Sequence, residues 1–113
     1  HRIQLKSSYT GFFAETRWTF YFFTNNDYQL RYEGHVGNSS RKGRYFICDS
    51  MIVLLNDTEY FTQFKTKRLK IIDDNCLRDF WNNYYCDSEE MLEKRYDFDA
   101  AIRFVRDSNQ IFS

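Results

Sequence analysis

Residues 17–33 constrain the fold most strongly, because their side chains alternate in type on both sides of a short polar segment. Every second residue is large and apolar before and after Asn25-Asn26-Asp27: Trp18, Phe20 and Phe22, then Tyr28, Leu30 and Tyr32. A period of two on both sides of an Asn/Asp turn predicts a β-hairpin. The second arm has a polar face, formed by Gln29, Arg31 and Glu33, whereas the first arm is apolar on both faces. The first arm is therefore predicted to be a central or covered strand.

Three further segments have strand character. Residues 44–48 and 51–55 are apolar runs separated by Asp49-Ser50, which predicts a second hairpin, and residues 34–42 before it read as a polar loop. Residues 67–72 alternate basic and apolar side chains, as a half-exposed strand does. A turn at residues 73–75 leads into residues 76–86, which are compatible with one more strand lined by Leu77, Phe80, Trp81, Tyr84 and Tyr85. The pattern does not assign the aromatic segment at residues 60–64.

The C-terminal part changes in character at Asp87. Asp87 and Glu90 satisfy a capping pattern, and acidic residues are favourable at a helix N-terminus. A helix is therefore predicted from about residue 88 to 96, with Met91, Leu92 and Tyr96 on its apolar side. Residues 98–112 fit helical spacing, but Ile102 and Phe104 around Arg103 also fit a strand, and we favour the strand. The predicted fold is mainly β: an antiparallel meander, curled or partly closed into a small barrel, with one C-terminal helix.

Composition sets the class of protein. The 113 residues suffice for one domain, residues 1–113, and the 20% aromatic content suits a small sheet protein. The formal net charge is zero, which argues against a nucleic-acid partner and against adhesion to an anionic membrane. No stretch approaches the roughly 18 consecutive apolar residues that a membrane span needs.

The three cysteines allow two interpretations. Cys76 and Cys86 flank a nine-residue span that a disulfide would close across a hairpin or loop, and Cys48 lies in an apolar run that suggests a buried free thiol. Disulfides mark oxidising compartments and small cores, so we favour the bridge. The alternative is three reduced thiols, packed as small apolar side chains.

No catalytic or metal-binding pattern is evident. His35 is the only internal histidine, and Glu33 is the only nearby acid with which it would share a strand face; we interpret His35 as a surface loop residue. The carboxylate pairs at residues 73–74 and at 57 and 59 lie in polar turns, where Asp is favoured for its backbone hydrogen bonds. The four glycines match no nucleotide-binding pattern, and we expect no cofactor and no metal.

The aromatic residues are the remaining candidates for binding. Tyr and Trp are enriched at interfaces, although most are expected to pack the core. Tyr84 and Tyr85 are adjacent, so a strand would point them to opposite faces and leave at least one partly exposed. The candidate interface residues are Trp81, Tyr84, Tyr85 and His35.

Several motifs resemble small secreted or lipid-anchored proteins of Bacteroidetes-type bacteria: Tyr9-Thr10-Gly11-Phe12, Gly34-His35-Val36-Gly37, Lys42-Gly43-Arg44-Tyr45, Arg68-Leu69, Cys76-Leu77 and Tyr84-Tyr85-Cys86. The resemblance implies a periplasmic, lipid-anchored or secreted location, is consistent with a paired disulfide, and transfers no catalytic residue. The strand rhythm also looks like lipocalin-type meanders. The chain is short for a full eight-stranded barrel and lacks the glycine-X-tryptophan opening of that family, which puts a large ligand cavity in doubt.

These observations favour a non-enzymatic, extracytoplasmic module that binds another protein, such as an immunity protein that neutralises a bacterial toxin. The alternative is a small lipocalin-like carrier whose cavity Trp18, Phe20 and Phe22 would line. An enzyme would depend on Glu33 and His35 alone. The sequence leaves open the identity of the partner, the oligomeric state, and whether a lipid anchor precedes residue 1.

Overall fold

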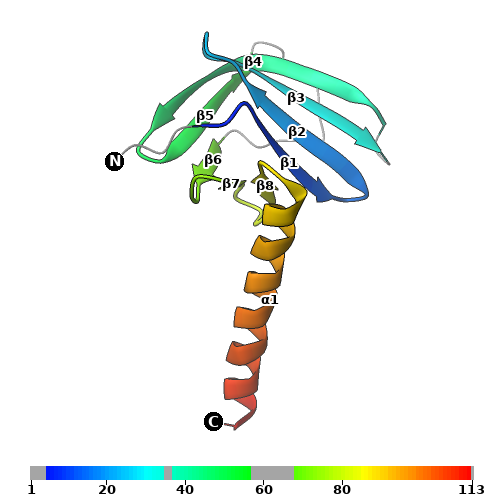
Figure 1. The fold of residues 1–113 in the computed structure, drawn as a ribbon, viewed down its shortest axis with the longest axis vertical. Coiled ribbons are helices and arrows are strands. Elements are labelled where there is room, and N and C mark those ends of the chain that lie inside the picture. Colours follow the sequence, from blue (N-terminus) through cyan, green and yellow to red (C-terminus); the bar gives the residue numbers. More distant parts are fainter. Residues whose placement is uncertain (1–4, 35–36, 57–67, 113) are drawn as a thin grey trace.

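The chain folds into a closed antiparallel barrel of eight strands followed by one helix (Figure 1). The computed structural model describes residues 5–34, 37–56 and 68–112. The elements are β1 (Ser8–Phe13), β2 (Thr16–Phe22), β3 (Asp27–Gly34), β4 (Ser39–Cys48), β5 (Met51–Asn56), β6 (Arg68–Ile71), β7 (Cys76–Arg78), β8 (Tyr84–Cys86) and α1 (Glu89–Phe112). The predicted fold class is confirmed, but the expectation that the chain is too short for eight strands is wrong.

Each strand pairs with its neighbour in the sequence, and β1 pairs with β8 to close the barrel at Thr10 and Cys86. Gly11 makes this seam possible. A Cβ atom at Gly11 would lie 2.5 Å from the Tyr84 carbonyl oxygen and 2.7 Å from Cδ2 of Tyr85, so a side chain there would push β8 away. The pairing of β1 with β8 leaves neither the first nor the last strand as a sheet edge.

Aromatic rings fill the interior. Phe20 stacks on Phe22 with ring centroids 6.0 Å apart and meets Tyr85 edge-on at 5.1 Å. Trp18 stacks on Phe13 at 5.1 Å. Eight strands enclose a space that side chains can just fill, and large rings fill it with few residues.

Both predicted hairpins and the predicted strand at residues 67–72 are confirmed. The β2–β3 turn contains Asn26 with φ of 69°, and Asp49 and Ser50 both have positive φ in the two-residue β4–β5 turn. Such turns match the twist of antiparallel strands. In β6, Leu69 and Ile71 are buried, whereas the basic residues between and before them are exposed.

Other predictions about the strands are corrected. The sequence did not indicate β1, and β4 begins at Ser39, inside the segment that was read as a polar loop. Residues 76–86 form two three-residue strands joined by a loop, not one strand. Cys48 is free but exposed, because alternation along β4 turns Gly43 and Tyr45 inward and leaves Cys48 on the outside.

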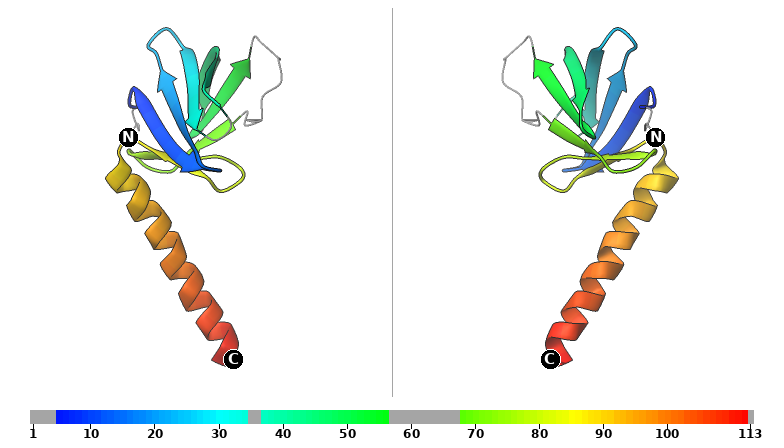
Figure 2. Two further views of the ribbon diagram at one scale, coloured as in Figure 1. Left: turned by 90° about the vertical axis from the view of Figure 1, so that its right-hand side faces the viewer. Right: turned by 90° about the vertical axis from the view of Figure 1, so that its left-hand side faces the viewer.

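The helix begins on the barrel and then leaves it (Figure 2). Ser88 caps α1 by accepting a hydrogen bond from the Met91 backbone N–H at 3.2 Å, whereas the predicted cap, Asp87, accepts a bond from Asn75 instead. Met91 and Leu92 pack over β7 and β8, and Arg95 forms an ion pair with Asp73. Residues 98–112 continue the helix, so the strand favoured for them is wrong. A strand there would need a partner strand, whereas a nucleated helix satisfies its own backbone hydrogen bonds and extends at little cost.

The predicted disulfide between Cys76 and Cys86 is present and joins β7 to β8 at directly paired positions. Both sulfur-bearing residues are buried, in a small cluster with Tyr84 against which Met91 and Leu92 of α1 pack. The disulfide therefore links β7 and β8, the two shortest strands, covalently at the place where the helix packs against the barrel.

Candidate functional site: an aromatic loop beside a basic strip

The loop between β7 and β8, residues 79–83, is organised around the carboxylate of Asp79, which is 2% exposed. Oδ1 of Asp79 accepts hydrogen bonds from the backbone N–H groups of Trp81 at 2.8 Å and Asn83 at 2.9 Å. Oδ2 accepts one from the Asn83 side-chain amide at 3.2 Å and one from the Tyr85 hydroxyl at 2.8 Å. A buried carboxylate with four donors holds the loop in one conformation.

Tyr85 anchors this network from inside the barrel. Burial raises the pKa of the Tyr85 phenol, and the negative charge of Asp79 and the hydrogen bond to it raise that pKa further. The phenol therefore stays protonated and acts as a hydrogen-bond donor to Asp79. This arrangement has a structural use, since it ties the loop to the core.

The fixed loop presents two aromatic side chains outward. Phe80 is 54% exposed and Trp81 is 62% exposed. The guanidinium carbon of Arg68, on β6, lies 5.1 Å from the centroid of the Phe80 ring, which is cation–π geometry. We call Phe80 and Trp81 the aromatic loop residues. Exposed aromatic side chains on a rigid backbone lose little conformational entropy when a partner covers them.

A row of cations lies beside this loop. Lys70 of β6 is directly opposite Arg78 of β7, and Arg68 lies two residues before Lys70 on the same face. We call Arg68, Lys70 and Arg78 the basic strip. Within the described parts of the chain, none of the three forms an ion pair, and Nε of Arg78 is buried without a hydrogen-bond partner. Like charges directly across a strand pair are destabilising, so this arrangement has an energetic cost in the isolated chain.

The outer face of the β4–β5 hairpin continues this surface. Val53 of β5 is paired with Arg68 on one side and with Phe46 on the other. Phe46 is 47% exposed, and Leu55, two residues beyond Val53, is 48% exposed. Apolar side chains exposed next to one another, with charges at their border, are typical of interaction surfaces.

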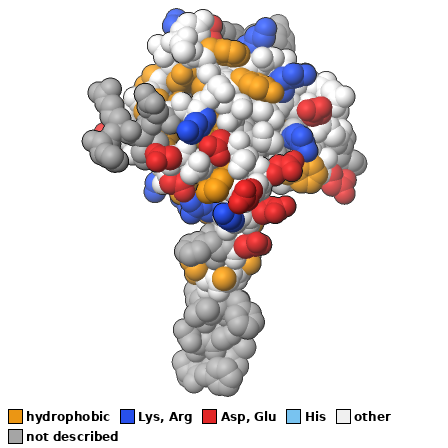
Figure 3. Space-filling model, in the orientation of Figure 1, with side chains coloured by type: hydrophobic (Ala, Val, Ile, Leu, Met, Phe, Trp, Pro, Cys, Tyr) orange, Lys and Arg blue, Asp and Glu red, His pale blue; other side chains and the backbone are white. Residues whose placement is uncertain are grey.

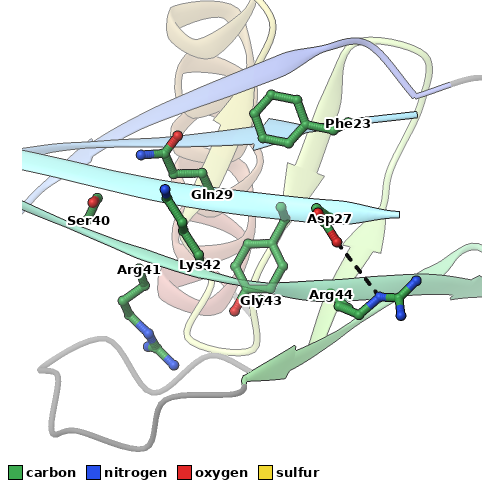
Figure 4. A pocket seen from close by; sticks show the side chains of 9 residues that line it. Phe23, Asp27, Gln29, Ser40, Arg41, Lys42, Gly43 and Arg44 are labelled. Carbon is green, nitrogen blue, oxygen red and sulfur yellow. Dashed lines mark ion pairs between the residues drawn. The ribbon is translucent and has the colours of Figure 1, made fainter. Parts of the chain in front are cut away.

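A second surface feature is a hollow of about 710 Å³ over β3 and β4 (Figure 4). Its lining includes Gln29 and Lys42, which are a cross-strand pair, and the Arg44–Asp27 ion pair, with 3.7 Å between Nε and Oδ1. The groups lining it are mainly polar and basic, and no nucleophile with an orienting base is among them. The hollow therefore offers polar contacts but no catalytic arrangement.

The predicted interface residues do not form one surface. Trp81 is exposed, but Tyr84 and Tyr85 are 6% and 0% exposed, so the expectation that one of them reaches solvent is wrong. Tyr85 points into the barrel, and Tyr84 lies outside it beneath α1, where its ring meets Tyr96 edge-on at 5.2 Å. His35 lies outside the described residues.

Among the described residues, the remaining candidates for chemistry are not brought together. Glu33 is exposed on β3, and the acids at residues 57 and 59 are outside the described part of the chain. Asp73 accepts bonds from the Asn75 and Cys76 backbone N–H groups, which is the predicted turn role. Within residues 5–34, 37–56 and 68–112, no three His, Cys, Asp or Glu residues are grouped as a metal would need. No helix in these segments is long and apolar enough to cross a membrane.

The residues proposed to line a carrier cavity are packed against other rings. Trp18, Phe20 and Phe22 are 3%, 0% and 7% exposed and belong to the main buried cluster. Phe20 and Phe22 stack on each other, Phe20 also meets Tyr85, and Trp18 stacks on Phe13. This packing favours a core role for the three residues.

Sequence reasoning missed Asp79 and the basic strip. Asp79 and Asn83 bracket three residues between two cysteines, and an Asp followed by such a segment is a turn signal that could have marked the loop. Arg68 and Lys70 were recognised as the exposed face of a strand. Their proximity to Arg78 and Phe80 depends on the pairing of β6 with β7, which the local sequence does not specify.

Comparison with known proteins gives no match: no family model, no curated protein and no solved structure is significantly similar to this chain. Its function must therefore be argued from its own surface.

Proposed function

We propose that this chain is a protein-binding module that recognises its partner with the aromatic loop. The observation that supports this most directly is the exposure of Phe80 and Trp81 on a loop that Asp79 holds rigid. Aromatic residues and Arg dominate the energetics of protein interfaces, and Arg68 already lies against Phe80. Phe46 and Leu55 extend the apolar area on the neighbouring hairpin.

The disulfide supports an extracytoplasmic location for this module, because such bridges persist in oxidising compartments. A thiol titration of the denatured protein, isolated from its native cells with thiols trapped at lysis, tests this. One free thiol per chain, from Cys48, is the expected result, and three free thiols would argue for a reducing compartment.

The binding proposal is tested with two double variants in a proximity-crosslinking experiment on native cells. Phe80→Ser with Trp81→Ser removes the aromatic loop residues. Phe23→Ser with Ile47→Ser is the matched control, since these two residues are 46% and 50% exposed near the β2–β3 and β4–β5 turns. Crosslinked proteins that the first variant loses and the control retains support the proposal. Equal crosslinking by both variants would refute it.

An immunity protein is one instance of such a module. Co-expression with the products of adjacent genes would identify this case. If one of these products is a toxin, we expect the wild type to protect the cells and the Phe80→Ser, Trp81→Ser variant to fail to protect them. Native mass spectrometry distinguishes the carrier alternative, because a carrier would retain an apolar ligand after purification. Rescue that persists without the aromatic loop residues would show that another surface is used.

A further inference from the structure

The zero net charge of this protein conceals a separation of charges. Among described residues, strands β3 to β7 contain seven basic residues and two acidic ones: Arg31, Arg41, Lys42, Arg44, Arg68, Lys70 and Arg78 against Asp27 and Glu33. Acidic side chains instead gather where the helix joins the barrel (Figure 3), from the turns at residues 73–74 and 87 and the helix residues Glu89 and Glu90. The part of the barrel formed by β3 to β7 therefore carries an excess of basic residues.

Two groups of cations on these strands differ in how their charges are neutralised. On β3 and β4, Arg44 has Asp27 as an ion-pair partner, and Lys42 is opposite the amide of Gln29. On β6 and β7, Lys70 is opposite Arg78, and no acid within the described chain pairs with either. The nearest carboxylate along the chain, Asp79, is buried and already accepts four hydrogen bonds.

We propose that the partner presents an acidic segment whose carboxylates occupy the basic strip, Arg68, Lys70 and Arg78, while its apolar residues cover Phe80 and Trp81. This proposal rests on the proposed function and specifies the chemistry of the partner at the same site. Arg68 connects the basic strip with the aromatic loop residues, because it belongs to the strip and also lies against the Phe80 ring. An acidic partner removes the repulsion between Lys70 and Arg78, so binding relieves a cost that the free chain bears.

An acidic protein segment fits this surface better than a nucleic acid. The strip contains three cations next to two large apolar side chains, and a nucleic-acid site uses a longer run of cations along the phosphate backbone. Aromatic residues with adjacent Arg are instead the composition of a protein hot spot.

The test uses a phage-displayed library of random 16-residue peptides, selected on the purified oxidised protein at low salt. We expect the selected peptides to be rich in Asp and Glu with one or two apolar residues. The variant with Arg68→Gln, Lys70→Gln and Arg78→Gln should bind these peptides about tenfold more weakly, as the loss of two exposed ion pairs and one half-buried ion pair implies. The variant with Arg31→Gln, Lys42→Gln and Arg44→Gln has the same net charge and should bind them as the wild type does.

The outcomes separate this proposal from the proposed function. Peptides without acidic enrichment that still require Phe80 and Trp81 would overturn the acidic-partner proposal and leave the binding module intact. Peptides that do not require Phe80 and Trp81 would overturn both. Stronger binding of double-stranded DNA or heparin than of any selected peptide, lost in the basic-strip variant, would replace the acidic protein with a polyanion.

Stability gives a readout that does not depend on a partner. Because Lys70 and Arg78 repel each other, the basic-strip variant should melt at the same temperature as the wild type or slightly higher. A melting temperature lowered well below that of the matched charge variant would indicate that the strip has a structural role instead.

The salt dependence of peptide binding tests the same charges. Raising the salt concentration should weaken the peptide complex of the wild type and leave that of the basic-strip variant nearly unchanged.

Discussion

The aromatic loop and the part of α1 beyond Tyr96 both expose apolar side chains, but among the described residues only those of the loop are held in place by the core. Phe80 and Trp81 lie on a backbone that Asp79 and Tyr85 tie to the barrel interior. In α1, the described contacts with the barrel lie between Glu89 and Tyr96, and Ile102 farther along is 49% exposed. The two regions thus differ in support: the Asp79 network holds the loop side chains, whereas the described side chains of α1 beyond Tyr96 show no contact with the barrel.

The largest effect should come from breaking the loop network. Asp79→Ala would leave the Tyr85 hydroxyl and the loop N–H groups without their acceptor, and we expect the free energy of unfolding to fall by about 3–5 kcal/mol. Urea denaturation at neutral pH measures this. Asp74→Ala, at an exposed turn position, should change it by less than about 0.5 kcal/mol, and similar losses in both variants would show that the loop is not specially held.

The disulfide should have the next largest effect, because it fastens β7 to β8 beneath the helix. Replacing Cys76 and Cys86 together with Ser should lower the free energy of unfolding by about 2–4 kcal/mol. Cys48→Ser is the control, since that thiol is free and exposed, and should be nearly neutral. An unchanged stability in the double variant would mean that helix docking and strand pairing alone hold this side of the barrel.

Alkaline pH offers a third way to probe the loop anchor. Because the pKa of Tyr85 is raised in the folded protein, the unfolded chain releases this proton first, near pH 10, and the contribution of Tyr85 is present below that pH and lost above it. The free energy of unfolding should fall above pH 10 by up to about 1.4 kcal/mol per pH unit for this residue. Denaturation curves at pH 8 to 11 should be less pH-dependent for Tyr85→Phe, and identical slopes would contradict the buried phenol.

The smallest effect should come from removing the projecting part of α1. A chain that ends at Asp97 keeps Met91, Leu92 and Tyr96, so the barrel should lose less than about 0.5 kcal/mol while far-ultraviolet circular dichroism shows less helix. A chain that ends at Ser88 loses these contacts and should be destabilised by about 2 kcal/mol or more. A large loss in the longer chain would show that the distal helix supports the barrel after all.

The strands were predictable where one face of the sheet differs from the other. In residues 18–22 and 28–32, the side chains at alternate positions that the sequence marks as large and apolar are more buried than their neighbours, and β6 has the same pattern. It fails in β1, where Gly11 is one of the inward positions, and at the start of β4, where Ser39 and Ser40 pair with β3 although both are polar. Those strands form because neighbouring strands supply hydrogen-bond partners for their backbones. The side chains of a segment give little information about whether such a partner is present.

The candidate site was predictable only in part. Trp81 was identified from its residue type, but Arg68, whose guanidinium lies over the ring of the adjacent Phe80, is brought there by the pairing of β6 with β7. Tyr84 was misassigned because the helix that covers it begins in a later segment. Exposure depends on every element that packs nearby, and a strand pattern describes only the strand itself.

The amino-acid sequence by itself determined the antiparallel meander, the two tight turns, the cysteine pair and the start of the helix, because each depends on residues close together in the chain. Tertiary structure alone decided that the barrel closes at Gly11, that residues 98–112 extend the helix away from the barrel, and that three cations assemble beside two exposed aromatic rings. The physical reason is that closure, the direction of the helix and surface composition arise from contacts between distant segments, whose energies no local pattern contains.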